Sequence, residues 1–479
     1  MINETNYYLN TFNVTERDLC SLVAEGLKGG GSYCDLYFEN TSYRDILLRD
    51  SEVSSGGFHV DYGVGIRVLC GEKTGYAYSE STDYPSMLAA ARAASAITSN
   101  VCVNEDRRTS DHRHFGRPNR AADRFPMLQD WRDAEIEAQV PLLKRIDSEI
   151  RKGDARVVKV IAMLSSQVSD ILMFNSFEEM KYDTRPMGSI MVSCVFSQNG
   201  RVENKSVSRS FRKGAEMLTD GLVKEIVAAA LDGVDAMFEA RRPKGGKMPV
   251  VMGAGASGIL LHEAMGHAFE ADFNRKGQSI FSDRMGQRVC KPGITVVDDG
   301  TLRSNRGAVN FDDEGVPGQY TAMVEDGVLT SYLHDRISAE YYGVAPTGNG
   351  RRESFRYNPI PRMRATYMEN GDADRDSIIA SVKKGIYVDQ FANGQVKIGE
   401  GDFTFYVKSG FLIENGRLTM PVKDLNIIGN GPQALSDIEA VADDLNIDNG
   451  TWTCGKEQSV PVSCGMPTVL VNNLTVGGE

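Results

Sequence analysis

Two stretches of alternating polar and apolar residues constrain the fold of this chain more than any other feature of its sequence. The first holds short runs at 33–39, 43–48, 64–69 and 74–78, separated by glycine-rich turns, and the second holds longer runs at 157–164 and 190–196. Successive side chains of a strand point to opposite faces, so this alternation is typical of antiparallel sheets with one buried face. Helical patterns accompany them at about 15–28, 84–97, 134–152 and 215–240.

Two polar segments divide the chain into domains. Residues 103–125 are charged and contain little apolar surface, and residues 241–247 are rich in Arg, Lys, Pro and Gly. Both compositions are typical of linkers. Beyond 247 glycine becomes more frequent, and short β patterns alternate with turns. We therefore predict an α+β fold with two domains. Residues 1–240 form an N-terminal α/β region with antiparallel strands, which can be divided into 1–102 and 126–240 around the linker 103–125. Residues 241–479 form a large β-rich C-terminal domain, built as a curved sheet or a barrel-like body.

Composition and charge narrow the class of protein. The 479 residues include 53 basic and 65 acidic side chains, a net charge of −12. This balance disfavours direct binding of nucleic acid, which requires a basic face. We find no secretory signal at the N-terminus and no uninterrupted apolar run of about 18 residues, so we expect no membrane association. Eight scattered cysteines without a CxxC pair indicate reduced thiols and a cytoplasmic location.

The sharpest chemical signal is a pair of histidines five residues apart, His262 and His267, with Glu263 directly after the first. Zinc peptidases commonly place two histidines four residues apart on a helix. On a regular α-helix five steps leave the two side chains ~140° apart, too far to share one ion. A π turn leaves only ~50° between them. We therefore predict a π-bulge or another irregularity between the histidines, with Gly266 as the residue that permits the distortion. The alternative is a surface helix with two unrelated histidines.

A zinc site also needs a third protein ligand. Two acidic residues nearby and three distant cysteines are candidates: Glu270, Asp272, Cys290, Cys454 and Cys464. Lys456 lies close to Cys454 in the sequence and would favour its thiolate form. Spacing alone does not choose between Cys454 and Glu270.

A glycine- and arginine-rich segment is a second candidate for function. It comprises Thr347, Gly348, Asn349, Gly350, Arg351 and Arg352. We expect it to line the site and to bind a peptide through its backbone or its guanidinium groups. The alternative is a glycine-rich turn with two solvated arginines.

The sequence from 262 to 267, His-Glu-Ala-Met-Gly-His, matches HExxxH and resembles the signature of the TldD/PmbA metallopeptidases, specifically of the TldD-type subunit. The resemblance extends from about residue 12 to the C-terminus and is strongest after 245. Further blocks that carry it are 298–302, 312–315, 345–354, 361–363, 412–416, 448–450, 454–456 and 473–478.

This resemblance implies a zinc-dependent peptidase that hydrolyses unfolded or extended peptides. It implies that His262, His267 and Cys454 hold the metal, which activates water, and that Glu263 is the general base. Other divalent metals stay open. The resemblance also implies a sister PmbA/TldE-type subunit that lacks the motif, with self-association as the alternative. Two other functions stay open as well: a non-catalytic peptide-binding or regulatory subunit, and a metal-dependent amidohydrolase of small molecules.

Overall fold

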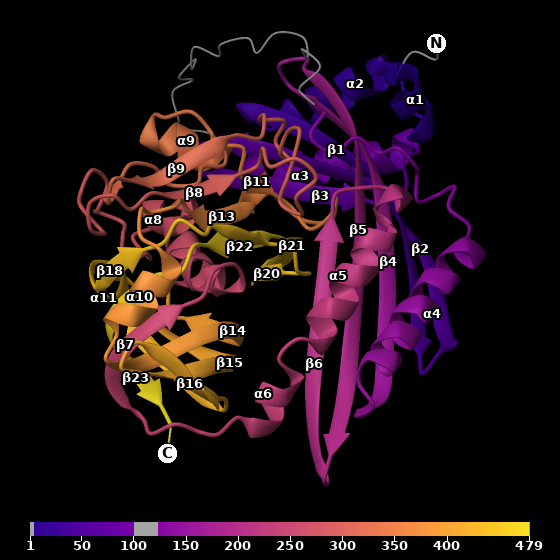
Figure 1. Ribbon diagram of the computed structural model, residues 1–479. Helices are drawn as coiled ribbons and strands as arrows, with labels where there is room; N and C mark the ends of the chain where they lie inside the picture. The colour runs from indigo at the N-terminus through magenta and orange to yellow at the C-terminus, as the bar shows by residue number, and fades with distance from the viewer. Residues whose placement is uncertain (1–3, 100–122, 479) are drawn as a thin grey trace.

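The computed structural model describes residues 4–99 and 123–478 and confirms the α+β class (Figure 1). Six antiparallel strands form one sheet in the order β3-β2-β1-β4-β5-β6. They are β1 (Tyr33–Arg49), β2 (Glu52–Cys70), β3 (Lys73–Ser79), β4 (Val157–Asn175), β5 (Met180–Gln198) and β6 (Arg201–Phe211). Because β1 pairs with β4, the segments on both sides of the predicted linker share this sheet. Residues 103–122 of that linker lie outside the described residues.

Two details of the predicted strands are wrong. The runs 33–39 and 43–48 are not separated by a turn but form one strand, β1. The glycine-rich residues 54–57 do not form a turn but lie inside β2, where Gly57 faces Asp45 of β1. The turn is limited to Asp50 and Ser51, which both have positive φ angles. Their conformation matches a tight two-residue connection, so the strands continue for 17 and 19 residues.

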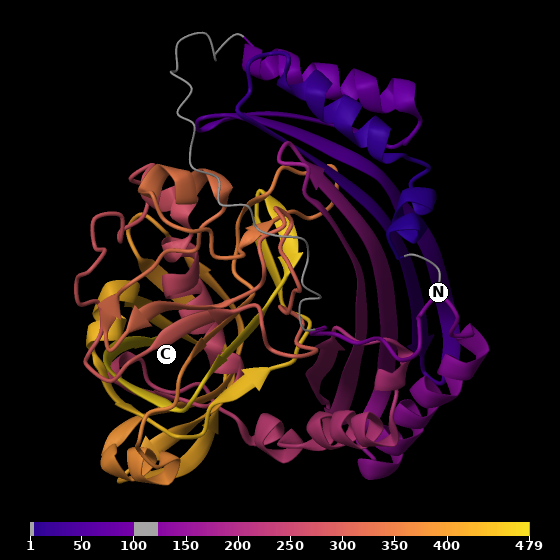
Figure 2. The same cartoon turned by 90° about the horizontal axis from the view of Figure 1, so that it is seen from above.

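Helices cover the outer face of the sheet, and the C-terminal half lies on its inner side (Figure 2). The three helices α1 (Glu4–Thr11), α2 (Glu16–Leu27) and α3 (Tyr84–Ser99) contribute to one hydrophobic cluster with β1 and β2. A second cluster joins the middle of the sheet to α4 (Ile136–Gly153), α5 (Asp220–Leu231) and α6 (Val234–Glu239). None of the helices in the described ranges combines the length and apolar character that a membrane span requires.

The C-terminal half is built around a closed five-stranded barrel, which confirms the prediction of a barrel-like β domain. Its strands pair in the order β14-β7-β23-β17-β15, and β15 pairs back with β14. They are β7 (Gly246–Met252), β14 (Lys384–Val396), β15 (Asp402–Glu414), β17 (Leu425–Asn430) and β23 (Val469–Gly477). Two further strands, β16 (Arg417–Val422) and β18 (Ile438–Val441), pair with β15 and β23.

A second sheet of this half has the order β10-β9-β8-β13-β22-β19. It contains β8 (Val296–Asp299), β9 (Tyr320–Glu325), β10 (Val328–Leu329), β13 (Ala365–Met368), β19 (Asn446–Asp448) and β22 (Ser463–Met466). Two small hairpins are β11 (Gly350–Arg351) with β12 (Ile360–Pro361), and β20 (Thr453–Lys456) with β21 (Gln458–Pro461). The helices are α7 (Ile259–Leu261), α8 (Ala271–Arg275), α9 (Arg336–Tyr342), α10 (Arg375–Ser381) and α11 (Gly431–Ser436).

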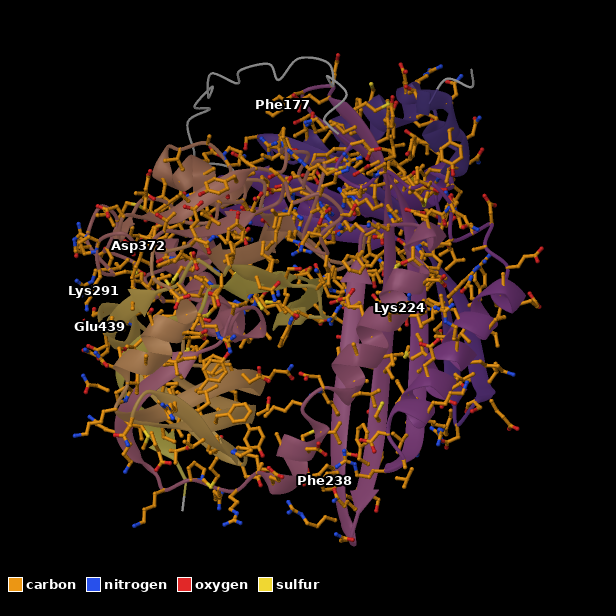
Figure 3. The ribbon with its side chains drawn as sticks, in the orientation of Figure 1. Phe177, Lys224, Phe238, Lys291, Asp372 and Glu439 are labelled. Atoms are coloured by element: carbon orange, nitrogen blue, oxygen red, sulfur yellow. The ribbon has the colours of Figure 1, made fainter. Side chains whose placement is uncertain are left out.

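Buried ion pairs join the sheet to the C-terminal half. Arg67 of β2 is fully buried, and its guanidinium donates to Asp35 at 2.8 Å and to Glu314 at 2.6 Å. Removing one partner of a buried pair leaves an uncompensated charge and costs about 3–5 kcal/mol. The exposed pair of Lys291 and Glu439, 2.8 Å apart on the C-terminal half (Figure 3), contributes little by comparison because water screens it.

Gly65 of β2 gives a direct test of this junction. A Cβ atom at this position would lie 2.0 Å from the hydroxyl of Tyr76 and 2.5 Å from the carbonyl oxygen of Phe355, which that hydroxyl binds. We expect Gly65→Val to lower the free energy of unfolding by about 1–3 kcal/mol, because the C-terminal half must move away from β2. Urea unfolding measures this. Gly221→Ala is the control, because its nearest neighbour is 3.7 Å away; equal stability of the two variants would contradict the prediction.

Candidate metal centre

The two histidines lie on a short π-helical turn. Strand β7 leads through a 3-10 turn (Ala256–Gly258) and α7 into a π-helix over His262–Gly266, followed by a 3-10 turn over His267–Phe269. The predicted irregularity between the histidines is confirmed. It brings the two imidazole rings to a centroid distance of 5.1 Å with an interplanar angle of 82°. The rings are therefore close enough to act on one ion.

The reason for a glycine at position 266 differs from the predicted one. Gly266 has an ordinary right-handed conformation, with φ −55 and ψ −52. A Cβ atom there would lie 1.9 Å from the sulfur of Met363. Glycine is needed because Met363 packs directly on the helix, and not because the turn requires unusual backbone angles.

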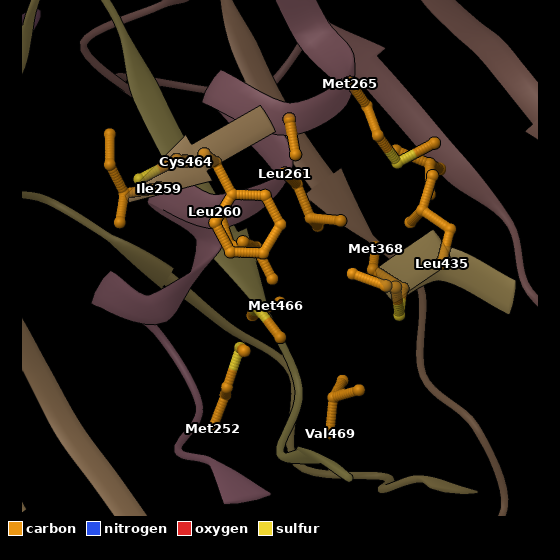
Figure 4. Packing of buried hydrophobic residues seen from close by; sticks show 14 of the residues in the cluster. Met252, Ile259, Leu260, Leu261, Met265, Met368, Leu435, Cys464, Met466 and Val469 are labelled. Carbon is orange, nitrogen blue, oxygen red and sulfur yellow. The ribbon is translucent and has the colours of Figure 1, made fainter. Parts of the chain in front are cut away.

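Hydrophobic packing anchors this helical segment on its other side. The side chains belong to one buried cluster of the C-terminal half (Figure 4), which includes Leu260, Leu261, Met265, Met368, Leu435 and Met466. The backbone that carries the histidines is therefore part of the core and has a defined position.

Cys454 of β20 approaches the histidines from a different part of the chain. Its Sγ atom lies 3.3 Å from Nε2 of His267. One candidate ligand atom from each of His262, His267 and Cys454 lies within 4.8 Å of the others, and all three residues are buried. No other group of three such side chains with this spacing occurs among residues 4–99 and 123–478.

The electrostatics of the three side chains favour a cation. Burial alone would raise the pKa of the Cys454 thiol, but the imidazoles of His262 and His267 lower it to about 4. Burial would likewise lower the pKa of His267, but Glu270 and Cys454 raise it to about 10. A buried thiolate beside two imidazoles is the type of donor set that binds zinc.

Glu270 lies on the outer side of His267 and not among the three donors. Its Oε2 atom is 3.0 Å from Nδ1 of His267, which turns Nε2 toward Cys454. Burial would raise the pKa of Glu270, but Lys456 and His267 lower it to about 2. A carboxylate on the second ring nitrogen orients a metal-binding histidine. Of the two candidates that spacing left open, the structure thus brings Cys454, and not Glu270, to both histidines.

The other candidate ligands lie elsewhere. Asp272 accepts a hydrogen bond from Lys456 at 2.8 Å. Burial raises the pKa of Cys290 to about 12 and holds the pKa of Cys464 well above its usual value, so both favour the neutral thiol. The prediction that Lys456 favours the thiolate form of Cys454 is wrong. The Lys456 ammonium pairs with Glu270 and Asp272, and the two histidines stabilise the thiolate.

The residues present fit a zinc ion. They supply one thiolate and two imidazoles, and both are ligand types that zinc binds. The Nδ1 atom of His262 is also buried without a hydrogen-bond partner among the described residues. Glu263 follows His262 directly and is half-buried, and its side chain makes no hydrogen bond with the described part of the chain.

The segment from Thr347 to Arg352 contacts the hairpin that carries Cys454, and both of its arginines are buried and hydrogen-bonded within the protein. Arg351 is 3% exposed and donates to the carbonyl oxygen of Pro461 at 2.7 Å. Arg352 is 5% exposed and donates to the carbonyl oxygen of Asp313 at 3.0 Å. The alternative of two solvated arginines is wrong. Peptide binding by this segment stays a prediction. In the structure, its two arginines hydrogen-bond to main-chain carbonyl groups inside the protein.

Arg362 is the residue of this region that sequence reasoning missed. It is fully buried, donates to the carbonyl oxygen of Cys454 at 2.7 Å, and lies 3.6 Å from Glu270. The sequence places it 92 residues before Cys454. The signal in the sequence was its place in 361–363, one of the blocks that carry the family resemblance. That block predicted no role for the Arg362 side chain.

Comparisons with known proteins identify the family of this chain. The family models for PmbA/TldA metallopeptidase domain 1, central domain and C-terminal domain match residues 34–98, 129–234 and 245–478. The metalloprotease TldD homolog of Haemophilus influenzae is 38% identical over the full length of both chains. The zinc metalloprotease TldD homolog of Saccharolobus solfataricus is 32% identical over 53% of this chain and 57% of its own.

Solved structures share the fold at low identity. A putative modulator of a DNA gyrase from Thermotoga maritima has a TM-score of 0.75 and 20% identity, covering 96% of this chain and all of its own. TldE from Thermococcus kodakarensis has a TM-score of 0.73 and 18% identity, with the same coverage. These structures share the fold, and the three matched domains with the full-length relative show that the chain belongs to the PmbA/TldD family of metallopeptidases.

Proposed function

We propose that the chain is a cytoplasmic zinc-dependent peptidase that hydrolyses unfolded or extended peptides, with His262, His267 and Cys454 as the metal ligands and Glu263 as the general base. The observation that carries the proposal is the meeting of two imidazoles and one thiolate within 4.8 Å, with a free carboxylate on the residue after His262.

The protein's own residues would do the following. His262, His267 and Cys454 hold the ion in a buried position, and Glu270 fixes the orientation of His267. When bound, zinc polarises the scissile carbonyl and makes a water molecule more acidic. Glu263 accepts a proton from that water as its oxygen bonds to the carbonyl carbon. The same carboxyl group then delivers the proton to the amine nitrogen as the C–N bond breaks.

The edge strand β6 of the six-stranded sheet is an argument for an extended peptide as the substrate. The Ser210 amide donates to the carbonyl oxygen of Asn449, and the Thr451 amide donates to the Ser208 hydroxyl, so the end of β6 is tied to the loop that leads to Cys454. The rest of β6 pairs with β5 alone among the described strands. A peptide can add to such an edge through main-chain hydrogen bonds, which place few demands on its sequence.

Metal removal tests the proposal. The purified chain, alone and mixed with a sister PmbA/TldE-type subunit, is dialysed against a chelator and then given Zn²⁺. We expect cleavage of an unstructured peptide to disappear with the metal and to return at about one ion per chain. Mass spectrometry identifies the products, and the same sequence inside a folded domain is the control substrate.

Three outcomes would contradict this assignment. Cleavage by the metal-free chain would exclude a metal mechanism. Peptide binding without cleavage by the zinc-loaded pair would favour the non-catalytic, regulatory alternative. Cleavage of small amides but not of peptides would favour the amidohydrolase.

A further inference from the structure

We propose that Arg362 is a positioning residue that fixes Cys454 relative to His267 by joining the Cys454 hairpin to Glu270. The inference rests on the proposed function in one respect only, because it takes Cys454 and His267 as metal ligands. The two ligands come from separate elements, 187 residues apart in the chain. Something other than local backbone geometry must therefore set the distance between them.

One half of the connection runs from Arg362 to the hairpin β20–β21. Its two terminal nitrogens donate to the carbonyl oxygen of Cys454 at 2.7 Å and to that of Gln458 at 2.8 Å. These carbonyls belong to both strands of the hairpin. The guanidinium therefore holds the hairpin by the main chain of the cysteine itself.

The other half runs from Arg362 to the histidine. Its Nε atom lies 3.6 Å from Oε1 of Glu270, and both side chains are fully buried. The second oxygen of Glu270 lies 3.0 Å from Nδ1 of His267 and 3.0 Å from Nζ of Lys456, which is itself part of β20. The Lys456 ammonium thus binds the carboxylate oxygen that orients the histidine, and the Arg362 guanidinium faces the other oxygen at ion-pair distance, where neither Nε nor Oε1 has a hydrogen-bond partner among the described residues.

The backbone of Arg362 is itself fixed by Asn349. The Arg362 amide donates to the carbonyl oxygen of Asn349 at 2.9 Å, and the Asn349 side chain donates to the carbonyl oxygen of Arg362 at 3.0 Å. The same side-chain amide donates to Asp298 of β8 at 2.7 Å. Arg362 is therefore attached to a strand of the second sheet and can serve as a fixed point.

The chemistry of this position requires arginine. A guanidinium presents five donors in a planar fork, so it can bind two carbonyl oxygens and face a carboxylate at the same time. A lysine ammonium is a point charge and cannot span these groups. Loss of the connection would leave Cys454 free to move away from His267. Partners of metal ligands typically change metal affinity 10–100-fold when they are removed.

The experiment compares Arg362→Lys with Arg67→Lys in the full-length chain. Arg67 is equally buried and ion-paired but lies at the junction with the sheet, so it controls for general loss of stability. Zinc affinity is measured by competition with a chromophoric chelator, and the thiolate–metal contact is measured by the near-ultraviolet band of the Co²⁺-loaded protein. We expect about 10–100-fold weaker zinc binding and a changed cobalt band for Arg362→Lys, and neither change for folded Arg67→Lys.

A second variant keeps the test decisive if Arg362→Lys does not fold. Glu270→Gln retains an acceptor for His267 but removes the charge that faces Arg362 and Lys456. It should weaken zinc binding by a similar factor, and in combination with Arg362→Lys the two effects should be less than additive in the logarithm of Kd, because they break the same connection.

The results separate this inference from the proposed function. Wild-type zinc affinity and an unchanged cobalt band in Arg362→Lys and Glu270→Gln would overturn the positioning role. Full zinc binding by a His262→Ala variant would instead overturn the ligand set itself.

Discussion

Replacing Glu263 by glutamine is expected to lower kcat/KM for peptide hydrolysis about 10²–10⁴-fold while the chain keeps its full complement of zinc. The physical reason is that the amide retains the shape of the carboxylate but cannot take a proton from water. The loss should appear in kcat, since the metal and the surfaces that bind the peptide are unchanged. Steady-state kinetics with metal analysis of the same sample measures both quantities.

Glu400→Gln is the matched control for this variant. Glu400 is an exposed side chain paired with Lys397 at the surface, so its loss should leave hydrolysis unchanged. Normal hydrolysis by zinc-loaded Glu263→Gln would exclude Glu263 as the general base.

Replacing Cys454 by alanine is expected to abolish both zinc retention and hydrolysis. The change removes the single thiolate of the ligand set, and the two remaining imidazoles cannot hold the ion alone. The loss of affinity should exceed the roughly 10–100-fold effect of removing an outer partner. Metal analysis after dialysis and the thiolate band of the Co²⁺-loaded protein report the loss directly.

Cys20→Ala controls for the loss of a thiol, because Cys20 lies exposed on α2. Zinc retained at full occupancy by Cys454→Ala would mean that another side chain, with Glu270 nearest to His267, supplies the third ligand.

The irregular helix could be predicted because it follows from the number of residues between the two histidines. Two histidines five residues apart reach the same side only if the helix contains a wider turn, and the structure has a π-helix over His262–Gly266. The role of Gly266 could not be predicted, since it depends on Met363, which reaches the helix from a distant part of the chain. The same applies to residues 54–57, whose glycines suggested a turn although they continue a strand.

The sequence by itself determined what depends on neighbours along the chain: the alternation that builds the sheets, the acidic charge, and the helical segment with His262, Glu263 and His267. Only the tertiary structure chose Cys454 over Glu270 on geometric grounds, and only it revealed Arg362. The physical reason is that a ligand set and its supports are defined by distances in space. The hairpin with Cys454 lies 187 residues from His267 in sequence but 3.3 Å from it in the folded chain, and no periodicity or spacing encodes that approach.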